Sequence, residues 1–166
     1  MRLAYIILLV VCISCTSSAQ STLEKVKALD LNTINDNITT YYSTGYENQA
    51  AANLNLLSKS VGFFEEHFEV SQSFSIAVID SVNWGKITSI PYGLPFVSGP
   101  PYIVCIPANL ENGLSNIVTT AIEGYDLKDK YEMTNKEITD LFVSLIGFHE
   151  LGHIYARSYG ASFPNK

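Results

Sequence analysis

The segment His149-Glu150-Leu151-Gly152-His153, near the end of the chain, places two histidines four residues apart. On an α-helix, residues at this spacing lie on one face, so both imidazoles can reach a single metal ion. Glu150 would lie beside such an ion, where its carboxylate can take a proton from water. Zinc is the metal expected here, because it binds histidine and lowers the pKa of a water that it binds to about 7. The pattern therefore predicts a helix that holds zinc through His149 and His153.

The flanking sequence predicts that this helix is long and begins at Thr134. Thr134 and Glu137 have the spacing of a capping box, and Gly160 is a natural stop. Between these points, apolar and histidine residues recur at spacings of three and four: Ile138, Leu141, Phe142, Leu145, His149, Gly152, His153 and Ala156. We expect both histidines to extend this buried face, with Gly152 permitting close packing. The non-functional alternative is a helix with two hydrogen-bonded core histidines beside a surface glutamate.

The H-E-x-x-H segment resembles the active helix of the zincin metallopeptidases. The metzincin branch would have Gly in place of Ala156 and His in place of Tyr159, which excludes that branch. The segment is more similar to the gluzincins, the thermolysin- and aminopeptidase-like clan, and to a group of uncharacterised exported bacterial metallopeptidases. The resemblance implies zinc-dependent hydrolysis of a peptide bond, with His149 and His153 as ligands and Glu150 as general base. It also implies an α+β fold with a small mixed or antiparallel sheet packed on the active helix.

The third zinc ligand is the missing part of this pattern. In gluzincins it is a glutamate on the next helix, about twenty residues downstream, but residues 154–166 contain no Asp, Glu, His or Cys. Three explanations stay open: truncation of the chain before the ligand, an upstream ligand such as His67, or a catalytically silent zincin-like binding module of the cell envelope. His67 has the character of a partly exposed helix residue rather than of a metal ligand, and we favour truncation. Because two imidazoles leave two tetrahedral positions to water, the chain as written should bind zinc weakly.

Residues 1–19 have the pattern of a signal peptide. Met1-Arg2 precedes an apolar run from Leu3 to Ile13 that is too short for a stable membrane span. Two processing routes stay open, because Ser17-Ser18-Ala19 is a small-residue cleavage site whereas Ser14-Cys15 resembles a lipoprotein junction with Cys15 lipidated. We expect an exported protein that is periplasmic, extracellular or an outer-membrane lipoprotein. A structural lipoprotein with a coincidental histidine pair is a further alternative.

The net charge limits the classes of binding partner, and the cysteine count limits the possible disulfides. The net charge of −6 and the absence of a Lys/Arg cluster argue against nucleic acid and against anionic membrane surfaces. The expected partner is a peptide or protein substrate, and the sequence gives no oligomeric state. Cys105 is the only cysteine of the folded part apart from a lipidated Cys15, so no internal disulfide is possible. Cys105 lies in an apolar run and should be a buried, inert thiol.

We expect the rest of the chain to divide into a polar segment, residues 20–45, and a zincin-like domain, residues 46–166, that is incomplete at its C-terminus. Periodicity predicts two further helices and three strands in this domain: helices over 46–68 and 111–123, and strands over 74–80, 86–90 and 102–106. Residues 91–101, rich in Pro and Gly, should form a loop or an irregular edge strand. The resemblance would place residues 92–98 beside the substrate-binding edge or on the rim of the cleft. A plain surface loop is the alternative.

Overall fold

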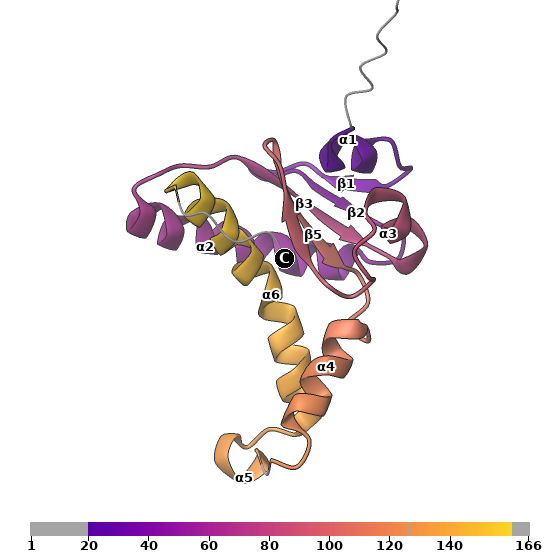
Figure 1. Cartoon of the computed structure of the whole chain (residues 1–166), viewed down its shortest axis with the longest axis vertical. Coiled ribbons are helices and arrows are strands. Elements are labelled where there is room, and N and C mark those ends of the chain that lie inside the picture. Colours follow the sequence, from indigo (N-terminus) through magenta and orange to yellow (C-terminus); the bar gives the residue numbers. More distant parts are fainter. Residues whose placement is uncertain (1–19, 126, 161–166) are drawn as a thin grey trace, which may run out of the picture.

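The computed structural model describes residues 20–125 and 127–160, and these residues build one five-stranded mixed sheet with helices on both faces (Figure 1). The strands run in the order β1 (Asn32–Ile34), β2 (Thr40–Tyr42), β3 (Phe74–Ile79), β5 (Tyr102–Pro107) and β4 (Phe96–Ser98). The central pairs β2–β3 and β3–β5 are parallel, whereas the outer pairs β1–β2 and β4–β5 are antiparallel. The two outer strands, β1 and β4, are therefore the edges of the sheet.

One face of the sheet is covered by the two longest helices, α2 (Glu47–Phe68) and α6 (Asn135–Ser158). Side chains alternate between the faces of a strand, and those of β3 and β5 that point to this side are apolar. The main core cluster combines them with residues of both helices: Leu54, Leu57, Phe64, Ile76, Val78, Val104, Ile106, Leu151, Ile154 and Tyr155 are among its members. This cluster fixes α6 on the sheet.

The opposite face of the sheet carries two short helices, α1 (Thr22–Lys27) and α3 (Ser81–Ile87). A second buried cluster joins them to the alternate residues of β3 and β5: Leu23, Val26, Ala77, Ile79, Trp84, Ile87, Ile103 and Cys105. As expected, Cys105 is a buried free thiol. Because both faces are covered, most residues of β3 and β5 are buried, which explains why all of them except Ser75 are apolar.

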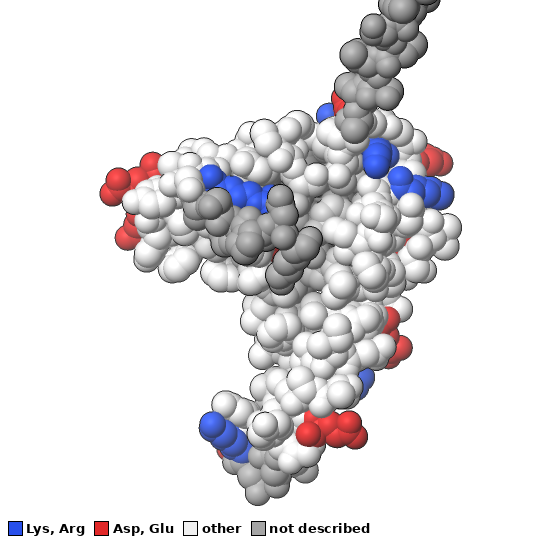
Figure 2. Space-filling view, viewed as in Figure 1, with Lys and Arg blue, Asp and Glu red and all other residues white. Residues whose placement is uncertain are grey.

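The remaining helices form an arm that projects beyond the sheet. It consists of α4 (Gly113–Ile122), the short α5 (Lys128–Tyr131) and the first half of α6 (Figure 1). α4 packs on α6, and the hydroxyl groups of Thr119 and Thr139 are hydrogen-bonded at 3.2 Å. Much of the visible surface of this arm is uncharged (Figure 2). Four large apolar side chains of the arm are about half exposed: Ile117, Leu141, Phe142 and Leu145.

The architecture is in keeping with the predicted α+β class, and the sheet is mixed. The helices over 46–68 and 111–123 and the strands over 74–80 and 102–106 are confirmed within a few residues. The strand expected over 86–90 is wrong, because Lys86 and Ile87 end the helix α3 and residues 88–90 form no strand. Asp80 caps that helix by accepting a hydrogen bond from the backbone N–H of Asn83 at 2.8 Å, and the buried Trp84 anchors it.

The segment 20–45 contributes more than its polar sequence indicated, because it supplies α1, β1 and β2. Thr40 and Ser43 are buried there, and Ser43 donates its backbone N–H to the carbonyl of Val78 on β3. The expected signal peptide, residues 1–19 with Cys15, lies outside the described residues. None of the helices formed by the described residues has the length and apolar character that a membrane span requires.

Candidate metal centre

α6 carries the candidate site, and its ends are those that the sequence predicted. The Thr134 hydroxyl accepts the backbone N–H of Glu137 at 3.2 Å, and the Glu137 carboxylate accepts the backbone N–H of Thr134 at 2.7 Å. This reciprocal capping box satisfies two donors of the first turn. The helix ends at Ser158, and Gly160 then adopts a φ of +92°, which favours glycine. The histidines lie in the second half of a helix that is fixed at both ends.

The face that α6 buries differs from the predicted one. The buried residues are Thr139, Val143, Gly147, Glu150, Leu151, Ile154 and Tyr155. Of the predicted stripe, Leu141 and Phe142 are 48% exposed and His149 is exposed, while His153 is half-buried. The expectation that both histidines extend a buried face is therefore wrong. Both stripes have helical spacing, and the first half of α6 extends past the sheet, so nothing among the described residues covers its outer side.

Gly147 explains which face meets the sheet. A Cβ atom at Gly147 would come within 3.0 Å of Ile106 Cδ1, 3.3 Å of Asn53 Oδ1 and 3.5 Å of Leu57 Cδ2. The absence of a side chain thus lets α6 approach both β5 and α2. At Gly152, by contrast, a Cβ atom would sit 3.4 Å from the Phe64 ring, which is an ordinary contact. Close packing depends on Gly147 rather than on Gly152.

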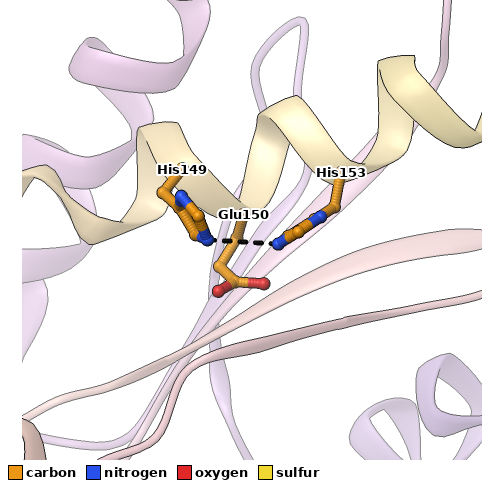
Figure 3. A group of neighbouring side chains, drawn as sticks. All are labelled: His149, Glu150 and His153. Carbon is orange, nitrogen blue, oxygen red and sulfur yellow. Dashed lines mark hydrogen bonds between the residues drawn. The ribbon is translucent and has the colours of Figure 1, made fainter. Parts of the chain in front are cut away.

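His149, Glu150 and His153 lie together on one side of α6, with the carboxylate beside the two imidazoles (Figure 3). The Nε2 atoms of the two histidines are 3.1 Å apart, and one ligand atom of each of the three residues lies within 4.8 Å of the others. Two nitrogens bound to a tetrahedral zinc ion, each about 2.0–2.1 Å from it, are separated by about 3.3 Å. The imidazole pair already has close to that separation. This group could hold a metal ion.

Glu150 is the buried member of the group, with 8% of its surface exposed. Burial disfavours the charged form and raises the pKa of the Glu150 carboxyl to about 7, while the positive charge of Arg157 acts in the opposite direction. Burial also raises the pKa of the Cys105 thiol on β5, and the charge of Glu150 adds to that effect. Glu150 thus faces the sheet, whereas the histidines flank it toward solvent. A carboxyl group that titrates near neutral pH is suited to take up and release protons.

The edge strand β4 lies beside this helix. α6 contacts both β4 and β5, and β4 pairs with β5 on one side only. Val97, opposite Val104, packs on the same side of the sheet as α6. The prediction of an irregular edge strand within residues 91–101 is confirmed for Phe96–Ser98. Tyr92, however, packs edge-on against Trp84 at 5.6 Å on the opposite face of the sheet, so it does not border the site.

His67 is not brought into the group. Its imidazole lies at the exposed end of α2, where Nδ1 is 2.7 Å from the carbonyl oxygen of Phe63, and the imidazole and phenyl rings are tilted against each other with centroids 4.2 Å apart. Within residues 20–125 and 127–160, the structure gathers only His149, Glu150 and His153 into a metal-ligating group. The sequence 161–166 lies outside the described residues. The described ligand set is therefore two imidazoles with one adjoining carboxylate.

Arg157 is the residue of this region that the sequence analysis missed. It is exposed, and it follows His153 by four residues, the same interval that separates the two histidines. This four-residue spacing is the sequence feature that could have identified Arg157. Comparisons with protein-family models, with curated proteins and with solved structures found no match for this chain. The chemistry of the site therefore has to be inferred from its own geometry.

Proposed function

We propose that this protein is a zinc-dependent hydrolase of peptide bonds, with His149 and His153 as zinc ligands and Glu150 as general base. The observation that supports this most directly is the pair of imidazoles with Nε2 atoms 3.1 Å apart and a buried carboxylate beside them. A buried carboxylate beside two histidines has no evident structural purpose, because burying an ionisable group costs stability. The resemblance of the H-E-x-x-H segment to the zincins points to the same chemistry.

The residues have separate roles in this proposal. His149 and His153 hold the ion at the open side of α6. A zinc ion bound there would polarise the scissile carbonyl and make a water molecule acidic. Glu150 would accept the proton of that water and then pass it to the leaving amine, as one group acting first as base and then as acid. The burial of Glu150 keeps bulk water from competing for this proton.

The edge strand β4 would position the substrate. An extended peptide can add to an exposed sheet edge through backbone hydrogen bonds, with alternate side chains pointing to either face. In β4, Val97 points toward α6, whereas Ser98 on the opposite face is hydrogen-bonded to Thr22 at 3.0 Å. A peptide paired with β4 would therefore run alongside His149 and His153. Its contact with Val97 would favour an apolar residue.

The test combines metal content with turnover. The wild-type protein, Glu150→Gln and His149→Ala are loaded with zinc, and cleavage of a mixed peptide library is followed by mass spectrometry. Glu150→Gln should retain zinc and lose activity by about a hundredfold or more, because a general base is removed. His149→Ala should lose both zinc and activity. Normal turnover by Glu150→Gln would refute the assigned mechanism.

A second candidate is a catalytically silent zincin-like binding module. It is favoured by one observation: the described residues supply only two imidazoles, whereas catalytic zinc sites generally have three protein ligands. Stoichiometric zinc without any cleavage of the library would favour this module. If His149→Ala left the metal content unchanged, the histidine pair would be coincidental and both candidates would fail.

A further inference from the structure

Arg157 lies on the same side of α6 as the metal-ligating group. It follows Glu150 by seven residues and His153 by four, so two full turns bring it back to the face of Glu150. Side chains on a helix lean toward its N-terminus, which directs the long side chain of Arg157 toward the turn of His153. Arg157 is exposed. Its guanidinium group is thus available at the C-terminal end of the site.

The positive charge of Arg157 lies two turns from Glu150 on the same face of α6, so it adds a positive potential at the C-terminal end of the site. In the part of the chain that the structure describes, the only salt bridge joins Lys136 to Asp140 at the other end of α6. Arg157 is therefore not paired with a described carboxylate. A basic residue in the last turn also interacts favourably with the helix dipole, but that interaction needs no approach to Glu150.

We propose that Arg157 binds a carboxylate of the peptide substrate and makes the site selective for anionic peptides. This inference rests on the proposed hydrolase function and adds the class of substrate to it. A guanidinium group matches a carboxylate with two parallel N–H···O bonds, which gives both strength and direction. The carboxylate is either the C-terminal group of the substrate or the side chain of an aspartate or glutamate.

The distance between Arg157 and the histidines sets where this carboxylate lies. One turn of helix separates Arg157 from His153, which is about 6 Å along the axis. An extended peptide advances about 3.3 Å per residue. The recognised carboxylate therefore lies about two residues from the bond that faces His149 and His153. Short peptides whose C-terminus is near the cleaved bond satisfy this condition, as do longer ones with an acidic side chain there.

Binding is measured without turnover, so that this inference is tested separately from catalysis. The zinc-loaded Glu150→Gln protein is titrated into three alanine tetrapeptides that carry an uncharged N-terminal dye, and fluorescence anisotropy gives Kd. One peptide has a free C-terminus, one is amidated, and one is amidated with a glutamate at its third position. Arg157→Ala, Arg157→Lys and the control Lys59→Ala, an exposed residue of α2, are compared in the same background. Zinc content and thermal unfolding are recorded for each variant.

Arg157→Ala should weaken binding of the anionic peptides by about tenfold or more and leave the amidated tetra-alanine unchanged, since a charge-assisted bidentate contact is lost. Arg157→Lys should recover only part of the loss, whereas Lys59→Ala should bind like the parent. Preference for the free C-terminus alone identifies the α-carboxylate, and preference for the glutamate peptide identifies a side chain. Equal affinity for all three peptides, or no binding, overturns the inference. Selective binding with no hydrolysis by the wild-type protein would sink the proposed hydrolase and retain Arg157 as an anion-binding residue.

Discussion

Tyr155 shows how closely the second half of α6 is packed. Its ring is fully buried and stacks on Phe64 of α2, with centroids 5.2 Å apart and planes 14° from parallel. Phe68 packs on the same ring at 6.3 Å. Among the described residues, no hydrogen-bond partner reaches the Tyr155 hydroxyl. A buried hydroxyl without a hydrogen-bond partner destabilises the folded state by about 1–3 kcal/mol. The packing of the Tyr155 ring therefore offsets the cost of burying its hydroxyl.

Replacing Tyr155 with phenylalanine should therefore stabilise the protein. The ring and its stacking remain while the unpaired hydroxyl is removed, so we expect Tyr155→Phe to raise the free energy of unfolding by about 1 kcal/mol. Urea denaturation followed by circular dichroism gives this quantity. Tyr159→Phe is the matched control, because Tyr159 is 69% exposed and its change should stay within about 0.5 kcal/mol. A loss of stability in Tyr155→Phe would show that the hydroxyl has a partner.

At the scale of the elements, α6 has two apolar faces with the same period. The face containing Leu141 and Phe142 was predicted to be buried, but the sheet and α2 cover the face containing Val143 and Gly147. Periodicity identifies a helix and the spacing within a face, but it does not identify which of two faces meets the sheet. That choice depends on the shape of the partner surface, here on the close approach of Ile106 to Gly147.

Shortening one side chain on each face of α6 should show which of the two faces is buried. Val143 is 3% exposed, so Val143→Ala should lower the free energy of unfolding by about 2 kcal/mol through lost burial and a small cavity. Leu141 is 48% exposed, so Leu141→Ala should change the free energy of unfolding by about 0.5 kcal/mol or less, although more carbon atoms are removed. Both values come from urea denaturation. The reverse order would restore the face that the sequence predicted.

The other elements could be predicted where the sequence pattern that specifies them lies within the element itself. The capping box at Thr134 and the regular apolar spacing in α2 can be read without knowing the fold. The strands β1 and β2 contain only three residues each and are rich in polar side chains. β2 is ordered by pairing with β3, more than thirty residues later in the chain, and β1 pairs in turn with β2, so no local pattern predicts either strand. The burial of Glu150 likewise depends on tertiary packing and cannot be predicted from the neighbouring residues.

At the scale of the whole molecule, the candidate metal site is separate from what holds the fold together. Neither His149 nor His153 belongs to the two buried clusters, whereas their neighbours Leu151 and Ile154 do. The sheet, α2 and the second half of α6 therefore place the imidazoles before any metal binds. This arrangement differs from that of zinc fingers, in which the metal supplies the folding free energy.

Removal of metal should consequently leave the fold intact. We expect excess EDTA to leave the far-ultraviolet circular dichroism spectrum unchanged, because the buried clusters do not include the ligands. Zinc should raise Tm only as its concentration passes Kd, since a tenfold excess over Kd stabilises the native state by about 1.4 kcal/mol. For a chain of this size that corresponds to about 3–5 °C. With two imidazoles as ligands, we expect this rise at micromolar zinc or above rather than at nanomolar zinc.

His149→Ala should abolish the zinc-dependent rise and leave the Tm in EDTA near that of the wild type. Unfolding upon addition of EDTA would show instead that the metal is part of the fold, and saturation at nanomolar zinc would show that further ligands complete the site.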